Sequence, residues 1–145
     1  MDTYSEPMGS NKQSEQNWKR DLTPYLTGYA AELLGAVEAP MPPEEIRIRA
    51  GRPIQLRFAK GERMLSGGGG RAPVSGSDCE AILSSFAEHS PYACEYELSQ
   101  GFLTLRGGYR VGICGKTVRD GAGFLRFEQV SGFCIRIARE IIGAS

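Results

Sequence analysis

The sequence has 145 residues, of which 41% are hydrophobic, so it can form one domain with a modest core. Its 17 basic and 17 acidic residues balance, which gives no sign of a nucleic-acid-binding protein or of one drawn to an anionic membrane. No apolar run approaches the roughly 18 to 20 residues that cross a bilayer, and the polar, acidic N-terminus is not a signal peptide. These features predict a cytoplasmic protein.

The first segment, residues 1–20, is polar and aperiodic and predicts a disordered tail. Its large hydrophobe, Trp18, either packs on the edge of the domain or stays exposed. The folded domain is therefore expected over residues 21–145. A helix is predicted to begin at Thr23-Pro24 and to end before Pro40. Apolar residues three and four positions apart form its buried stripe: Leu26, Tyr29, Ala30, Leu33 and Val37.

The next segments alternate polar and apolar residues, which predicts a small antiparallel ribbon of strands with one wet face. They are "EIRIRA", "PIQLRFA" and "RML", separated by turns at Gly51 and "AKGE". The ribbon is basic, with Glu62 as the only acid between Arg47 and Arg63. Either this is an ordinary solvated face, or it docks on a charged partner through four arginines: Arg47, Arg49, Arg52 and Arg57.

Two helices are expected to follow the ribbon. The "SGGGG" run at 66–70 precedes Arg71-Ala72-Pro73 rather than a helix, which favours a flexible connector over a phosphate-binding loop. Ser77 opens a predicted capping box, with a buried stripe behind it at Cys79, Ile82, Leu83 and Phe86. Ser90-Pro91 begins a second short helix that ends near Gly101. The single histidine, His89, lies between them and is interpreted as a loop or helix-end residue rather than a catalytic one.

From residue 102 the alternating pattern returns in four segments, "FLTLR", "YRVGICGKTV", "FLRF" and "FCIRIAR". Gly107-Gly108 and Asp120-Gly121 supply hairpin turns. The order of elements predicts an α+β fold, a single domain in which helices pack on an antiparallel sheet. The dry face of that sheet is expected to carry Ile46, Ile48, Ile54, Leu56, Val111, Ile113, Ile135 and Ile137.

Gly115-Lys116-Thr117 spells the end of a nucleotide-binding P-loop. A P-loop requires glycine five positions before Gly115, where this sequence has Arg110, and it opens a helix, whereas a turn follows here at Asp120. The three residues are therefore interpreted as part of a strand. No other catalytic set is recognisable, and Glu95 and Glu97 are expected to be solvated.

The four cysteines, Cys79, Cys94, Cys114 and Cys134, form no C-x-x-C pair. Without a secretory leader, the expected state is four reduced and mostly buried thiols with no bound metal. A disulfide or a four-cysteine zinc site is the alternative, although zinc ligands usually come from close pairs.

Three separated stretches carry a resemblance to a known family: "EIRIRAGRPIQLRF", "SPYACEYELSQGFLTLRGGYRVGICGKTV" and "SGFCIRIAREIIGA". From about Asp21 to its end, the sequence resembles the N-terminal domain of the stage III sporulation protein AA family, which is similar to the secretion and pilus-retraction ATPases of type II and type IV systems. In that family a RecA-like ATPase domain with Walker A and Walker B motifs follows, binds ATP and Mg²⁺, and assembles into hexamers. The sequence ends at Ser145, about where that domain would begin, so we expect a fragment or a truncated gene product that does not hydrolyse ATP alone.

The resemblance also implies partners and a place of action. The partners are the chain's own ATPase domain, neighbouring copies in a hexamer and other stage III sporulation proteins at the membrane, with no role for nucleic acid. The expected site is peripheral, on the mother-cell face of the forespore membrane, near the channel that joins the two cells.

By the same resemblance, strand arginines reach toward nucleotide or the ATPase domain. Arg110, Arg136 and Arg139 match those strands, and guanidinium is suited to phosphate because it offers forked donors and keeps its charge. The alternative for these residues is a solvent-facing position on a strand. The alternative function for the whole chain is a free-standing module that binds a protein or a membrane through the basic ribbon at residues 47–63.

Overall fold

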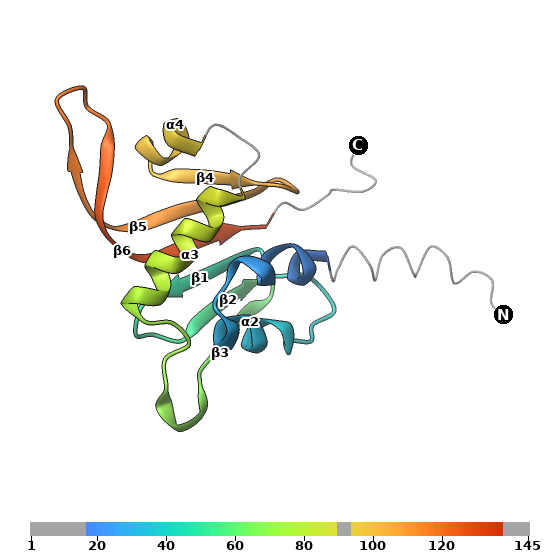
Figure 1. Cartoon of the computed structure of the whole chain (residues 1–145). Coiled ribbons are helices and arrows are strands. Elements are labelled where there is room, and N and C mark those ends of the chain that lie inside the picture. Colours follow the sequence, from blue (N-terminus) through green and yellow to red (C-terminus); the bar gives the residue numbers. More distant parts are fainter. Residues whose placement is uncertain (1–16, 90–93, 138–145) are drawn as a thin grey trace, which may run out of the picture.

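Six strands form one antiparallel sheet in the computed structural model, which describes residues 17–89 and 94–137 (Figure 1). From edge to edge the order is β3-β2-β1-β6-β5-β4. The strands are β1 (Glu45–Arg49), β2 (Ile54–Phe58), β3 (Gly61–Leu65), β4 (Phe102–Leu105), β5 (Tyr109–Arg119) and β6 (Leu125–Arg136). Helices pack against this sheet, so the predicted α+β fold with an antiparallel sheet is confirmed.

The predicted alternation along the strands is also confirmed. Of the eight residues expected on the dry face, seven are buried and Ile113 is partly buried against the core. Pairing between β1 and β6 places Ile46 opposite Ile135 and Ile48 opposite Phe133. Because side chains on one face of paired strands are neighbours, these contacts join the two halves of the chain into one core.

The segments "FLRF" and "FCIRIAR" belong to one strand, β6, where the sequence predicted two. The irregularity lies within β6 itself, which has one extra residue, Ser131, opposite the step from Cys114 to Gly115 and another, Glu128, opposite the step from Lys116 to Thr117. A bulge inserts a residue without ending the strand, so the pairing continues through both shifts. Residues 115–119 of β5 and 125–130 of β6 pair with each other alone in the described chain, and they project as a hairpin (Figure 1).

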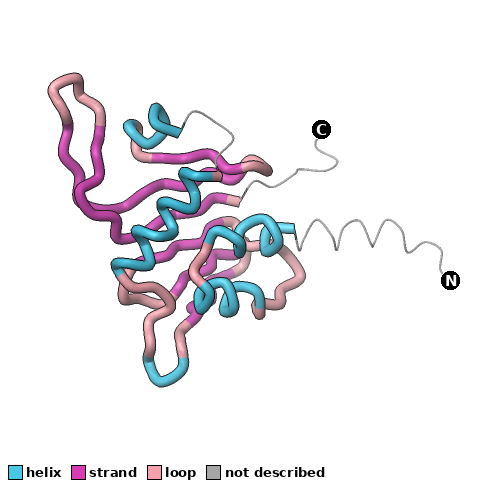
Figure 2. Tube along the Cα trace, viewed as in Figure 1, coloured by secondary structure: helices cyan, strands magenta, loops and turns pink. Residues whose placement is uncertain are grey.

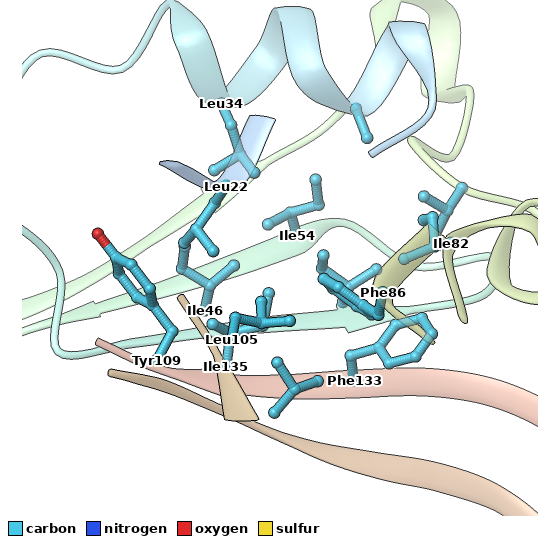
Figure 3. Packing of buried hydrophobic residues seen from close by; sticks show 14 of the residues in the cluster. Leu22, Leu34, Ile46, Ile54, Ile82, Phe86, Leu105, Tyr109, Phe133 and Ile135 are labelled. Carbon is cyan, nitrogen blue, oxygen red and sulfur yellow. The ribbon is translucent and has the colours of Figure 1, made fainter. Parts of the chain in front are cut away.

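The helix predicted to begin at Thr23 is two shorter helices. Thr23–Tyr25 is a 3-10 turn, η1, and Gly28–Gly35 is the α-helix α2. Between them Leu26 and Thr27 have extended backbone, with ψ of 160° and 156°. This break changes the direction of the chain, so that Leu22 before it and Leu34 after it both pack into the core (Figure 3).

The boundary of the tail requires a correction at its end. Residues 17–22 are helical, and Trp18 is only 3% exposed within the core cluster. Residues 17–20 therefore belong to the folded part, because burial of the large indole ring outweighs the polar character of its neighbours. The remainder of the expected tail, residues 1–16, lies outside the described residues.

The helix α3 (Gly76–Glu88) is capped by Ser75 and not by Ser77 as predicted. The Ser75 hydroxyl accepts from the Asp78 backbone N–H at 3.1 Å, and the Asp78 carboxylate accepts from the Ser75 N–H at 2.9 Å. The capping box is therefore the S-x-x-D motif of Ser75 and Asp78, which bonds both of these backbone N–H groups and begins two residues before the predicted box at Ser77. The predicted stripe is confirmed: Cys79, Ile82 and Phe86 are buried, and Leu83 packs partly against the core.

The helix α4 (Cys94–Ser99) precedes β4, and its predicted beginning at Ser90-Pro91 lies outside the described residues. Glu97 is not simply solvated, as the sequence suggested. Its two carboxylate oxygens accept from the backbone N–H and the hydroxyl of Thr104, each at 2.9 Å. The helix therefore ties down one edge strand of the sheet.

The tetraglycine segment is shaped by specific contacts and is not a featureless connector. Gly68–Gly70 forms a 3-10 turn at the tip of a loop (Figure 2). The hydroxyl of Tyr29 accepts from the Gly68 N–H at 3.0 Å, and the Arg71 guanidinium lies 4.2 Å from the centre of the same ring.

In the described part of the chain no helix is long and apolar enough to span a bilayer.

Candidate functional site

Gly115, Lys116 and Thr117 lie within β5, and the strand continues to Arg119. The backbone around Gly115 is crowded by the partner strand, since a Cβ there would collide with the carbonyl oxygen of Gln129. A P-loop must wrap its backbone around phosphate and open a helix. The interpretation of these residues as a strand is confirmed.

The predicted functional arginines meet on one face of the sheet. Strand pairing sets Arg110 opposite Arg136, Arg136 opposite Glu45, and Glu45 opposite Arg57. Arg47 and Arg49 follow Glu45 at two-residue steps and so share its face. We call this surface the arginine face, and define it by Arg47, Arg49, Arg57, Arg110 and Arg136. The helices α2 and α3 cover the other face of the sheet (Figure 1), and their apolar side chains are buried in the core there.

Two of the predicted arginines are not part of this arrangement. Arg52 is exposed in the turn after β1, and its backbone N–H bonds to the carbonyl of Arg49. Arg139 lies outside the described residues. The two groups that the sequence treated separately, the basic ribbon and the strand arginines near the C-terminus, are thus largely one surface.

Glu45, which the sequence analysis did not single out, lies at the centre of the arginine face. It is only 6% exposed and is the one buried charged residue in the described segments. Arg47 Nε donates to its carboxylate at 2.5 Å, the Cys134 thiol donates at 3.1 Å, and Arg57 Nη1 lies 3.9 Å away. A signal was present, because Glu45 alternates with Ile46 and precedes Arg47 by two residues, which puts both side chains on the same face.

The electrostatics of this cluster follow from its contacts. The hydrogen bond from Cys134 lowers the pKa of the Glu45 carboxyl, burial works in the opposite direction, and the bond and charge of Arg47 lower the pKa further. Burial, followed by the bond to Glu45, raises the pKa of the Cys134 thiol to about 11. Glu45 is therefore a carboxylate and Cys134 a neutral donor at neutral pH, which makes Cys134 a poor nucleophile.

Arg110 and Arg136 are directly opposite each other and both exposed. Neither forms an ion pair within the described residues, since Glu45 is occupied by Arg47 and Arg57. Arg110 lies 4.5 Å from the centre of the Phe102 ring, a cation–π contact that orients its guanidinium. Like charges directly opposite on neighbouring strands repel, so this pair is suited to an anionic partner.

The described thiols differ in their surroundings. Cys79 is buried, Cys134 is half-buried, and Cys114 is exposed, which corrects the expectation of mostly buried thiols for that residue. Burial, with the charges of Asp78 and Glu80, raises the pKa of Cys79 to about 11. All three are free thiols, and no group of three or more potential metal ligands occurs among the residues that the structure describes. Cys94 has no described side chain.

Replacing Glu45 by glutamine is expected to lower the free energy of unfolding by about 1 to 3 kcal/mol at pH 7, since charge-assisted bonds are lost. The folded-state pKa of Glu45 lies below its unfolded value, so its stabilisation is present above the unfolded pKa of about 4.5 and is lost as pH falls through the folded pKa. Urea unfolding of the wild type and Glu45→Gln at pH 7 and in steps below pH 5 should show the two curves converging.

Glu62→Gln is the matched control, because Glu62 is exposed in the same row of the sheet and accepts a single bond from Gln55 at 2.9 Å. Its effect should stay within about 0.5 kcal/mol. If the difference in the free energy of unfolding between the wild type and Glu45→Gln did not change with pH, the assigned role of the carboxylate would be contradicted.

Comparison with known proteins gives a consistent result. A family model described as "Sporulation stage III, protein AA" matches residues 20–145. Stage III sporulation protein AA of Bacillus subtilis (strain 168) is 37% identical to this chain over 100 residues, which are 69% of this chain and 31% of that protein. The chain therefore spans about a third of the length of this curated relative. No solved structure matches.

Proposed function

The chain belongs to the stage III sporulation protein AA family, and from this we propose that it is the N-terminal regulatory and assembly domain of a sporulation-associated, secretion-type ATPase. In this proposal the domain is not catalytic itself. It docks through the arginine face on an ATPase domain located elsewhere in the whole protein, and contributes positive charge near the nucleotide.

One observation carries the proposal: Arg110 and Arg136 are opposed on adjacent central strands, exposed, and unpaired with any described acid. Their strands are anchored by buried neighbours, Val111 and Ile135. Two opposed arginines would usually be neutralised by a nearby acid. Here the nearest acid in the row, Glu45, bonds to Arg47 instead. An acidic or phosphate-bearing partner would relieve the repulsion with bidentate, charge-assisted bonds.

ATP and Mg²⁺ do not fit the described residues of this chain as a site of their own. The P-loop-like residues are a paired strand, and the arginine face offers cationic donors without grouped carboxylates for a divalent cation. We therefore assign the nucleotide and the metal to the ATPase domain, and assign to this chain only the contact with it.

The proposed partners are that ATPase domain, neighbouring copies in a hexamer, and other stage III sporulation proteins at the forespore membrane. The alternative, a free-standing module that binds through the basic ribbon, has less support. Arg47 and Arg57 are held by Glu45, so part of the ribbon's charge is already neutralised within the chain.

The proposal predicts a functional defect without a folding defect for Arg110→Ala/Arg136→Ala. The gene for the whole protein would carry the double change in the native organism, with heat-resistant spores counted and the ATP turnover and oligomer mass of the purified product measured. We expect spores and turnover to fall by at least about ten-fold, the effect of losing one to two charge-assisted bonds. Urea unfolding of the 145-residue chain should be unchanged.

Lys116→Ala/Arg126→Ala is the matched control, since it removes the same charge from exposed positions on the same two strands, in the projecting hairpin. It should leave spore counts and turnover at wild-type levels. If the arginine-face variant and the wild type had equal turnover and equal oligomer mass, Arg110 and Arg136 would be ordinary solvated residues and the proposal would be wrong.

A further inference from the structure

We propose that a cleft on the helix-covered side of the domain binds a small ligand that carries an oxyanion, a phosphate or a carboxylate, on a flat apolar group. The cleft has a volume of about 470 Å³, which falls in the range of small-molecule sites. It brings together three segments that are distant in the sequence, and its lining residues are Arg20, Asp21, Pro24, Tyr25, His89, Arg106 and Gly107.

The base of the cleft is held by a hydrogen bond between distant parts of the chain. The Tyr109 hydroxyl donates to the Asp21 carboxylate at 2.6 Å, and burial raises the pKa of this tyrosine above its usual value. Figure 3 shows the Tyr109 ring at the edge of the core with its hydroxyl directed outward. Gly107 has φ of 96°, and a Cβ there would lie 2.7 Å from the Tyr109 ring. The turn between β4 and β5 can therefore pack closely against Tyr109 only because residue 107 is glycine.

The aromatic wall of the cleft is likewise fixed by packing. The Tyr25 ring lies 5.1 Å from that of Phe86, which is fully buried, and 6.1 Å from the His89 imidazole at 70°. His89 caps the C-terminus of α3, with its Nδ1 3.0 Å from the Ser85 carbonyl oxygen. A flat apolar group would find a stationary ring face here, with little ordering cost on the protein side.

The charge of the cleft favours an anion. Two guanidinium groups, Arg20 and Arg106, line it against one carboxylate, Asp21, which bonds to Tyr109 and lies 3.7 Å from Arg20. Arg106 has no ion pair among the described residues. Glu88, 4.0 Å from His89 Nδ1, is the other acid close to the imidazole. With two guanidinium groups and one carboxylate, the lining is therefore net positive at pH 7.

This site is independent of the arginine face. Tyr109 and Phe86 belong to the core on the helix-covered side, whereas Arg110 and Arg136 lie on the opposite side of the sheet. A ligand in the cleft would contact residues 20–25, the end of α3 and the β4–β5 turn at once, and would hold these three segments in place.

The chain has a single histidine, so one imidazole Hε1 signal in a proton NMR spectrum reports on this cleft alone. The full chain would be titrated with phenyl phosphate, benzoate and inorganic phosphate. We expect a saturable shift of the histidine signal with phenyl phosphate or benzoate at constant pH, because the bound aromatic anion would lie beside the imidazole ring. Whichever aromatic anion binds more tightly identifies the preferred oxyanion. Inorganic phosphate should bind at least about five-fold more weakly, because it lacks the apolar contact.

Arg20→Ala/Arg106→Ala should weaken binding by at least about ten-fold while leaving the fold intact, since charge-assisted bonds are lost from exposed side chains. The control, Arg110→Ala/Arg136→Ala, should bind the aromatic anions as the wild type does, which separates this proposal from the one for the arginine face. The absence of a saturable shift with both aromatic anions, an equal shift in the Arg20/Arg106 variant, or equal affinity for inorganic phosphate would overturn the proposal.

Discussion

Phe133→Ala is expected to lower the free energy of unfolding by about 3 to 5 kcal/mol, a large part of the 5 to 15 kcal/mol typical of a domain. Phe133 is 1% exposed and its ring meets that of Phe86 edge-on at 5.2 Å and 79° (Figure 3). This contact joins β6 to α3. Alanine would remove the apolar burial and the aromatic contact together, and would leave a cavity between sheet and helix.

Urea unfolding monitored by circular dichroism measures this effect. Phe124→Ala is the control, because Phe124 is 40% exposed at the tip of the β5–β6 hairpin. Its substitution should change the free energy of unfolding by less than about 1 kcal/mol. Comparable losses for the two variants would mean that α3 does not pack on β6 through this aromatic pair.

Gly132→Ala is expected to destabilise the domain by about 1 to 3 kcal/mol, the range for forcing atoms into a packed interior. Gly132 lies in β6 opposite Arg49 of β1, where a Cβ would collide with the carbonyl oxygen of Ile48 and lie 3.3 Å from the Arg49 Cα. Both obstacles are backbone atoms of a central strand. They can move only if the pairing of β1 with β6 is distorted.

The chain offers a matched control in Gly112, an interior glycine of the neighbouring strand β5. A Cβ at Gly112 would meet its nearest atoms, in Cys134, at 3.9 and 4.0 Å, which is ordinary van der Waals contact. Gly112→Ala should therefore be neutral, or stabilising by up to about 1 kcal/mol, because alanine restricts the unfolded chain. Urea unfolding of both variants tests the pair, and equal effects would show that β1 does not approach β6 closely at Gly132.

Much of the fold was predictable from local patterns. The buried faces of α3 and of the strands followed from apolar spacing, since side-chain direction repeats with the period of each element. The errors lie where tertiary contacts compete with local preference. Trp18 is pulled into the core from a polar segment, and the break at Leu26 and Thr27 lets two short helices reach the sheet where one straight helix was expected. The cap at Ser75 was missed because two serines precede Asp78 at short spacing, and only the backbone geometry distinguishes them.

The candidate site was predictable in its residue types and not in its assembly. Arg110 and Arg136 were identified through the family resemblance, and Arg47 and Arg57 through the basic ribbon. No local pattern shows that β1 lies beside β6. That pairing brings Glu45 of β1 within 3.1 Å of the Cys134 sulfur, although the two residues are 89 positions apart.

By itself, the sequence determined which side chains face inward along each strand, that Gly115-Lys116-Thr117 cannot form a phosphate-binding loop, and to which family the chain belongs. These properties depend on the neighbouring residues, because the direction of a side chain and the shape of a loop are local properties of the backbone. Only the tertiary structure decided which arginines keep a free charge. Glu45 is buried and forms ion pairs with Arg47 and Arg57 rather than with Arg136. Both facts depend on the order of the strands, and that order is set by the packing of the whole core.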